Sequence, residues 1–174
     1  CYTSGTTGVP KGVMLTHRNF SLIKKTMNSV GIQLETTDRH ISYLPLAHVL
    51  ERCFMVFVIA SGARVGFISG DITVLASDLQ ILQPDIFVTV PRLLNKIYHK
   101  IREGTVDASG PKGVISRLAV NSKLQTLERT GVYLNAFWDK IIFNKVASVL
   151  GGRIKAIIVG SAPISSQVLQ FMRV

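Results

Sequence analysis

Residues 84–91 read Pro-Asp-Ile-Phe-Val-Thr-Val-Pro, and this stretch predicts the centre of the fold. The five residues from Ile86 to Val90 are all β-branched or aromatic, and a proline lies on each side of them. Such side chains favour strands, and proline limits a strand because it cannot donate to the hydrogen-bond ladder. We therefore predict a central strand at Ile86–Val90.

Helical periodicity flanks this strand. Before it, Asp71 is predicted to cap a helix that runs to Leu82, and after it a helical period covers Arg92 to Ile101. The other predicted strands are Gly12–Leu15, Ile41–Leu44, Arg64–Ile68 and Ile154–Val159. The other predicted helices are His17–Val30 with Thr16 as cap, Val49–Ala60, Val114–Arg129, Ala136–Val149 and one capped by Ser165 or Ser166, with a loop at Glu103–Gly113.

Strands that alternate with helices predict right-handed βαβ units. The predicted fold class is therefore α/β, with a mostly parallel sheet that carries helices on both faces. We find no internal repeat and no low-complexity segment, so residues 1–174 are predicted to be a single domain or part of one.

The stretch at residues 2–12 reads Tyr-Thr-Ser-Gly-Thr-Thr-Gly-Val-Pro-Lys-Gly and has a composition suited to holding phosphate. Glycine allows backbone N–H groups to converge on an anion, hydroxyl side chains add donors, and Lys11 adds a cation. A solvated linker is the alternative, but a linker has no need for Pro-Lys-Gly followed at once by an apolar run. The P-loop pattern is not met, because Pro10 replaces its second glycine and Gly12 replaces its Ser or Thr.

Two more stretches follow predicted strands, and ligands of such sheets bind beyond the carboxyl ends of the strands. Leu-Pro-Leu-Ala-His-Val-Leu-Glu-Arg at residues 44–52 contains His48, and a lone histidine is more often structural than functional. Gly-Ser-Ala-Pro-Ile at residues 160–164 has small residues that admit a flat ring, although an ordinary strand-to-helix turn has the same composition.

Together these stretches resemble the signatures of the adenylate-forming superfamily, which includes acyl-CoA synthetases, luciferases and nonribosomal peptide adenylation domains. The form Leu-Pro-Leu-Ala-His-x-x-Glu-Arg, the segment at residues 90–97 and the segment at residues 137–153 are similar to the long-chain acyl-CoA synthetases in particular. The resemblance covers nearly the whole chain, and it implies part of the large N-terminal domain of an adenylate-forming enzyme.

The resemblance implies a long-chain fatty acid–CoA ligase. Such an enzyme uses ATP with Mg²⁺ to convert a fatty acid to acyl-AMP and pyrophosphate, and CoA as co-substrate then displaces AMP. His48, Lys11 and Thr6 would be the catalytic residues, with His48 beside the acyl carboxylate. The residues implied for phosphate binding are Thr3, Ser4, Gly5, Thr6, Thr7, Gly8 and Lys11, and those implied to contact adenine and the acyl chain are Gly160, Ser161, Ala162 and Pro163. No metal ligand is predicted within the chain.

Adenylate-forming enzymes are several times longer than 174 residues, and the sequence begins at Cys1 inside the glycine-rich signature. We therefore expect an internal fragment that lacks the remainder of the AMP-binding domain and the small C-terminal domain. Such a fragment is expected to be inactive by itself.

The charge is strongly positive and uneven. The formal net charge is +10, and residues 88–174 contain thirteen of the twenty Lys and Arg but four of the ten Asp and Glu. This balance alone fits a basic module that binds nucleic acid or an anionic membrane, which is one alternative function. Because the charges are spaced singly along amphipathic segments, lipid headgroups or the polyphosphates of ATP and CoA are favoured over nucleic acid. Another adenylate-forming ligase is the second alternative.

Cysteine content and hydropathy favour an intracellular protein. Cys1 and Cys53 provide no disulfide framework, which favours a reducing compartment. The longest apolar run, Cys53–Ala60, is too short for a bilayer span of about 20 residues, and no signal peptide opens the chain. We expect a cytoplasmic protein or one peripherally associated with the endoplasmic reticulum, mitochondrial or peroxisomal membrane.

Overall fold

The computed structural model describes residues 1–3, 8–132 and 135–173. They divide into two compact units. The first comprises Cys1–Val88 with Ile154–Ile158, and the second comprises Thr89–Arg153 with Val159–Val174. The chain leaves the first unit after Val88, returns to it at Ile154–Ile158 and leaves it again at Val159.

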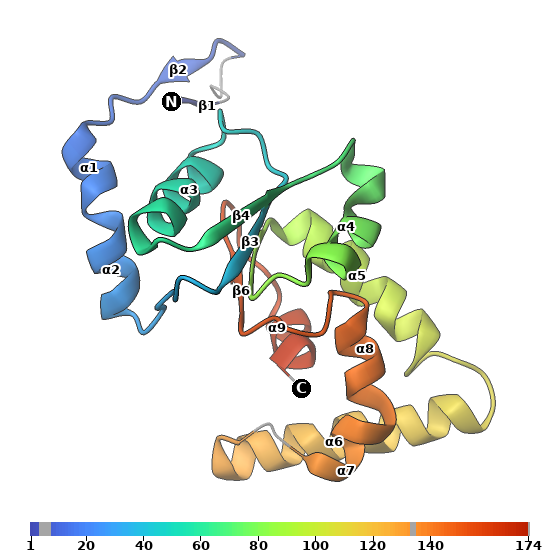
Figure 1. Cartoon of the computed structure of the whole chain (residues 1–174). Helices are drawn as coiled ribbons and strands as arrows, with labels where there is room; N and C mark the ends of the chain where they lie inside the picture. Colours follow the sequence, from blue (N-terminus) through green and yellow to red (C-terminus); the bar gives the residue numbers. More distant parts are fainter. Residues whose placement is uncertain (4–7, 133–134, 174) are drawn as a thin grey trace. The chain divides into compact units, whose positions relative to one another are not determined.

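A four-stranded sheet, in the order β4-β3-β5-β6, forms the centre of the first unit (Figure 1). Its strands are β3 (Arg39–Ser42), β4 (Arg64–Phe67), β5 (Ile86–Thr89) and β6 (Ala156–Val159). β3 pairs in parallel with both β4 and β5, and all four residues of β5 are buried. The predicted central strand and the parallel α/β fold are confirmed.

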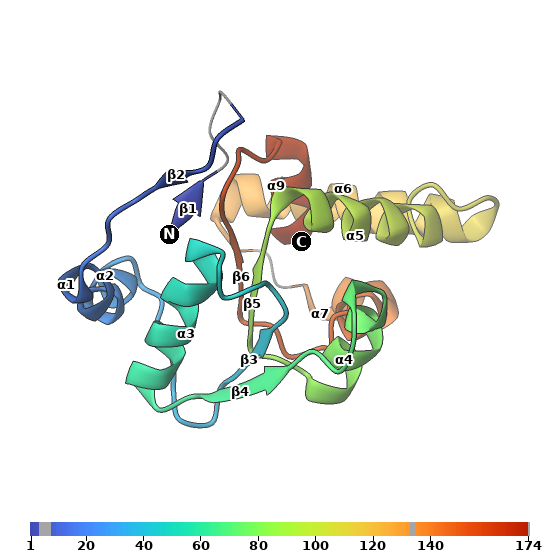
Figure 2. The same cartoon turned by 90° about the horizontal axis from the view of Figure 1, so that it is seen from above.

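Helices cover both faces of this sheet, as predicted. His40 of β3 points to α3 (Val49–Ser61), where its Nε2 lies 3.2 Å from Glu51 Oε1. On the opposite face, Gly66 of β4 packs so closely on α4 (Leu75–Leu82) that a Cβ atom would lie 2.6 Å from Leu82 Cδ2. Figure 2 shows α3 and α4 on either side of the strands. A side chain at position 66 would therefore force the Leu82 side chain to move.

The core of the first unit lies between α3 and the sheet. Phe54 and Phe57 of α3 pack on Ile86 and Val88 of β5, and all four side chains are buried. Burial of each such side chain contributes about 1.5–3 kcal/mol. This cluster therefore fixes α3 against the central strand.

The segment predicted as one helix, His17–Val30, forms two. Thr16 caps α1 (His17–Ser21) with a capping box to Asn19, as predicted, but the helix breaks at Leu22 before α2 (Ile23–Ser29). The break accompanies the packing of two α2 side chains, Ile23 and Met27, on the phenylalanine cluster. Tertiary burial outweighs the helical pattern here.

The predicted strand at Gly12–Leu15 is wrong. The strand is β2 (Lys11–Gly12), which pairs antiparallel with β1 (Tyr2–Thr3). Residues 13–15 are exposed, and Met14 is 96% exposed, so this apolar run gains no buried sheet face.

Asp71 caps a helix as predicted, but the first turn is the 3₁₀-helix η1 (Ile72–Val74) that precedes α4.

The second unit is helical. Its elements are α5 (Pro91–Gly104), α6 (Pro111–Thr130), α7 (Ala136–Trp138), the π-helical turn η2 (Asp139–Phe143), α8 (Asn144–Ser148) and α9 (Ser166–Arg173). The predicted loop Glu103–Gly113 shrinks to residues 105–110, because proline is compatible with the first position of a helix and Pro111 starts α6. Gly113 lies inside α6, where a Cβ atom would be 1.9 Å from the Ala108 carbonyl oxygen.

Candidate functional site

The described part of the glycine-rich stretch is a small antiparallel hairpin. Thr3 pairs directly with Lys11 across its two strands, and the Thr3 hydroxyl lies 3.5 Å from the Lys11 carbonyl oxygen. Directly paired residues project their side chains from the same face of a hairpin. The Thr3 hydroxyl and the Lys11 ammonium are therefore brought to one face, and both residues are exposed.

Gly8 lies on the second arm of this hairpin with a φ of +83°. Among the described residues, a Cβ atom at this position would meet nothing within 4 Å. Four predicted phosphate-binding residues, Ser4, Gly5, Thr6 and Thr7, lie outside the described residues. In the sequence, these four residues lie between Thr3, which provides a hydroxyl, and Gly8 and Lys11, which provide a glycine and a cation.

His48 is positioned by the start of α3. It is the N-cap residue of that helix, and its Nδ1 accepts a hydrogen bond from the backbone N–H of Leu50 at 3.3 Å. An Nδ1 that accepts must be unprotonated, so a neutral ring carries its proton on Nε2. The ring is half-buried. The loop before it is held by Arg52, whose Nε donates to the Leu46 carbonyl oxygen at 3.0 Å.

A buried polar pair behind this loop was missed by sequence reasoning. His40 and Glu51 are 1% and 0% exposed, and within the described part of the chain one ring nitrogen and one carboxylate oxygen, His40 Nδ1 and Glu51 Oε2, have no hydrogen-bond partner. Glu51 lies in the first turn of α3, where the helix dipole favours a carboxylate. The available signal was Glu51, an acidic residue in a largely apolar predicted helix, whereas His40 lies just before the predicted strand Ile41–Leu44 and nothing in the sequence linked the two.

The residues from Gly160 to Pro163 belong to the second unit and follow β6. The Gly160 N–H donates to the Thr89 carbonyl oxygen at 3.2 Å, which fixes the start of the turn. Ser161 has a φ of +76°, a conformation that non-glycine residues rarely adopt and that concentrates at functional sites. As predicted, a serine caps the next helix, since Ser165 Oγ accepts from the Val168 N–H at 3.4 Å. Sequence reasoning did not predict the strained backbone at Ser161.

Within the described ranges, no group of three or more His, Cys, Asp or Glu side chains could hold a metal ion. The same ranges contain no helix that is long and apolar enough to cross a membrane.

Comparisons with known proteins give a consistent result. A family model described as "AMP-binding enzyme" matches residues 1–174. The chain is 42% identical over 178 residues to rat (Rattus norvegicus) long-chain-fatty-acid–CoA ligase 5, with 99% of this chain and 26% of that protein covered. It is also 42% identical over 174 residues to the peroxisomal long chain acyl-CoA synthetase 7 of Arabidopsis thaliana, with 100% of this chain and 25% of that protein covered. The chain thus spans about a quarter of the length of these relatives.

A similar solved structure is the A domain of carboxylic acid reductase from Segniliparus rugosus in complex with AMP and a co-purified carboxylic acid. The TM-score is 0.64 at 25% identity, with 98% of this chain and 24% of that chain covered. The fold described above is therefore that of an adenylate-forming enzyme.

Proposed function

The chain belongs to the AMP-binding enzyme family, and we propose that it is part of the large N-terminal domain of a long-chain fatty acid–CoA ligase. The fatty acid carboxylate would attack the α-phosphorus of ATP and release pyrophosphate, and the CoA thiolate would then attack the acyl carbon and release AMP. The names of the relatives at 42% identity support this reaction class.

The observation that carries the proposal is the hairpin. Lys11 and Thr3 project from one face of the hairpin, and Gly8 precedes its second strand. A lysine ammonium, a hydroxyl and glycine N–H groups are the donors that bind the phosphates of nucleotides. In the proposed site these donors, with Ser4, Gly5, Thr6 and Thr7, hold the β- and γ-phosphates of ATP. Thr6 and Lys11 would also stabilise charge as pyrophosphate leaves.

His48 would act at the carboxylate. With Nδ1 engaged by the Leu50 N–H, its Nε2–H is the donor that can stabilise charge on the carboxylate and on the acyl phosphate that forms from it. In the second unit, Gly160, Ser161, Ala162 and Pro163 would contact adenine and the acyl chain. The strained φ of Ser161 supports a functional role for this turn.

We treat magnesium as part of the substrate MgATP. The described residues offer no three-ligand cluster for it, so no step is assigned to a metal ligand of this part of the chain. CoA is the second co-substrate. Peripheral association with an intracellular membrane is part of the proposal, supported by the basic residues of the second half, and a peroxisomal location is supported by the peroxisomal form among the relatives.

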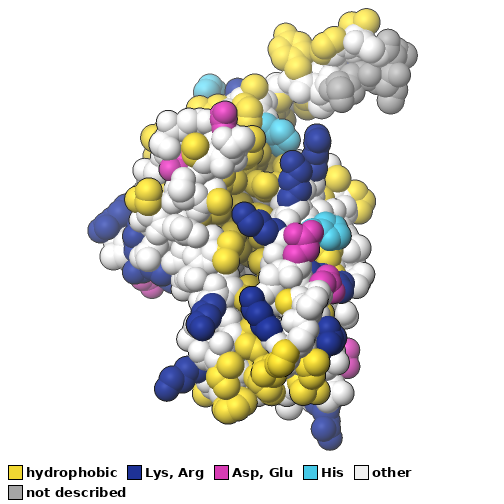
Figure 3. All heavy atoms as spheres, turned by 90° about the vertical axis from the view of Figure 1, so that its right-hand side faces the viewer, with side chains coloured by type: hydrophobic (Ala, Val, Ile, Leu, Met, Phe, Trp, Pro, Cys, Tyr) yellow, Lys and Arg dark blue, Asp and Glu magenta, His cyan; other side chains and the backbone are white. Residues whose placement is uncertain are grey.

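Two other functions are the alternatives to this proposal, and one observation bears on each. Activation of another carboxylic acid is favoured by the likeness to the carboxylic acid reductase domain. Nucleic-acid binding is disfavoured, because the sequence contains no run of three Lys or Arg residues. On the one face that Figure 3 shows, the Lys and Arg side chains lie dispersed among hydrophobic ones.

The experiment is fatty-acid-dependent exchange of pyrophosphate into ATP by the full-length gene product, which we propose is longer than these 174 residues. Exchange driven by palmitate but not by benzoate or acetate is expected. Exchange driven by benzoate alone would replace the proposal with the other-ligase alternative. Exchange by residues 1–174 alone at a comparable rate would contradict the assignment of the chain as part of a larger domain.

A further inference from the structure

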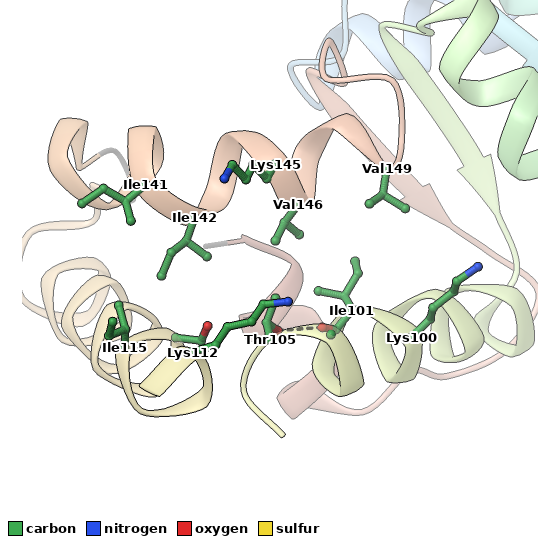
Figure 4. A pocket seen from close by; sticks show the side chains of 12 residues that line it. Lys100, Ile101, Thr105, Lys112, Ile115, Ile141, Ile142, Lys145, Val146 and Val149 are labelled. Carbon is green, nitrogen blue, oxygen red and sulfur yellow. Dashed lines mark hydrogen bonds between the residues drawn. The ribbon is translucent and has the colours of Figure 1, made fainter. Parts of the chain in front are cut away.

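The second unit contains an apolar cavity of about 550 Å³ that none of the described candidate site residues lines. Its walls come from α5, α6, η2 and α8 (Figure 4). The apolar lining residues are Ile101, Ile115, Ile141, Ile142, Val146 and Val149. The volume lies in the range of about 300–1,000 Å³ that is typical of small-molecule sites.

The side chains converge on this cavity from facing helices. Figure 4 shows Ile142, Val146 and Val149 directed toward the helices that carry Ile101 and Ile115. Two of the lining isoleucines, Ile115 and Ile141, are each 43% exposed. Thr105, a polar lining residue, donates its hydroxyl to the Ile101 carbonyl oxygen at 2.6 Å, so this group is already satisfied. The interior is therefore suited to an alkyl chain.

The charged residues of the lining are all positive. Lys100 of α5, Lys112 of α6 and Lys145 of α8 line the cavity, all three are exposed, and no Asp or Glu is among the lining residues. Lys112 and Lys145 come from facing walls (Figure 4). An apolar interior with cations on separate walls is complementary to a ligand with one alkyl chain and an anionic head.

We propose that this cavity is a second fatty acid site, in which the alkyl chain occupies the apolar interior and the carboxylate lies between Lys112 and Lys145. The choice of a fatty acid rests on the proposed function, which makes it the substrate class. The site itself shares no residue with the hairpin, with His48 or with the turn at Gly160–Pro163.

The test measures binding of cis-parinaric acid, an intrinsically fluorescent fatty acid, to the full-length gene product without ATP, with displacement by palmitate. Lys112→Met with Lys145→Met removes both charges but keeps the side-chain length, and Val146→Trp fills the cavity. Lys96→Met on α5, which is exposed and does not line the cavity, is the matched control.

The double variant should bind the probe about tenfold more weakly, as expected for the loss of two exposed ion pairs. Val146→Trp should lower the number of bound probes by one per chain, and the control should behave as the unmodified protein.

Equal binding by all these variants would overturn the site. Equal displacement of the probe by palmitate and by hexadecanol would overturn the role of the lysines. Binding to anionic phosphatidylserine vesicles without binding of the free probe would replace the fatty acid by a membrane surface and overturn the proposal. Pyrophosphate exchange is measured in parallel: its absence in the unmodified protein would reject the proposed function, whereas variant-sensitive probe binding would still support the cavity.

Discussion

At the amino-terminal end of the sheet in the first unit the carboxylates are buried and paired, whereas at the carboxyl-terminal end of β3 the histidine is half-buried. Asp85 Oδ2, at the start of β5, accepts from the Arg39 N–H at 3.0 Å, and the Lys155 N–H donates to the Asp85 carbonyl oxygen at 2.8 Å. Asp38 accepts from the Lys155 ammonium and, at 2.9 Å, from the Glu35 N–H. These contacts connect the amino-terminal ends of three neighbouring strands, β3, β5 and β6.

The carboxyl-terminal end is built on a different principle. There the chain leaves β3 through an exposed loop at residues 45–47, and His48 uses one ring nitrogen to cap α3. Polar groups at the amino-terminal end of the sheet therefore serve stability, whereas we propose that His48 at the other end serves ligand binding. Substitutions at the two ends should therefore separate stability from activity.

The largest expected effect on stability is at Asp85. Asp85→Ala should lower the free energy of unfolding by about 2 kcal/mol, because it leaves the part-buried N–H of Arg39 without its acceptor and removes the carboxylate that faces the partly exposed Arg39 side chain. Urea unfolding measures this loss. Asp71→Ala, which removes an exposed helix cap, is the control and should cost clearly less. An equal loss in both variants would mean that the amino-terminal end is no more tightly fixed than a surface turn.

His48 should show the opposite behaviour. Its replacement should lower pyrophosphate exchange by about 100-fold, the typical cost of one lost donor to developing charge. His48→Asn and His48→Ala divide the two roles of the residue, since Asn is a good N-cap and Ala is not. The Asn variant should keep its stability, and the Ala variant should lose about 1 kcal/mol. Full exchange activity in the Asn variant would reduce His48 to a cap.

Lys155 should make stability depend on alkaline pH. The hydrogen bond to Asp38 raises the pKa of Lys155 above its ordinary value of 10.5. A raised lysine pKa means that the folded state holds the proton more tightly, so the contribution is complete below the ordinary pKa and is lost as pH rises through the folded-state pKa. Unfolding measured against pH should show a decline on the alkaline side that Lys155→Met and Asp38→Asn each reduce. A double variant with a further, additive reduction would show that the two groups do not act as a pair.

The smallest expected effect is on α3 at Cys53. Burial raises the pKa of the Cys53 thiol, partly offset by the neighbouring Arg52. Less of the thiol is therefore ionised at neutral pH, and the thiolate is the reactive form. In a Cys1→Ser variant, disulfide exchange with Ellman's reagent should be slower than for glutathione. Faster reaction would show that α3 is more open at this position than its burial indicates.

The elements whose sequence signals are local could be predicted. The central strand, the α3 helix and the Thr16 cap were predictable, because proline boundaries, apolar periodicity and capping residues act locally. The composition of Tyr2–Gly12 predicted a phosphate-binding stretch. It did not predict that the two ends of this stretch pair as antiparallel strands, since the apolar residues after Gly12 suggested a buried strand. Local pattern does not reveal which partner a short strand finds.

The buried contacts between distant residues were not predictable. The pairs His40–Glu51 and Asp38–Lys155 join residues that are eleven and 117 positions apart, and no local pattern links them. The positive φ of Ser161 was missed for a related reason, because serine has no intrinsic preference for it and the surrounding fold imposes it.

The most direct test of the account is the response of Lys11 to substrate concentration. In the full-length gene product, Lys11→Met should raise the KM for ATP by at least about tenfold, as expected for the loss of a charge-assisted phosphate contact, and leave the KM for palmitate unchanged. Lys25→Met, an exposed lysine on α2, is the matched control and should change neither value. An unchanged KM for ATP in Lys11→Met, or an equal rise in both KM values, would contradict the assignment of the hairpin to the phosphates.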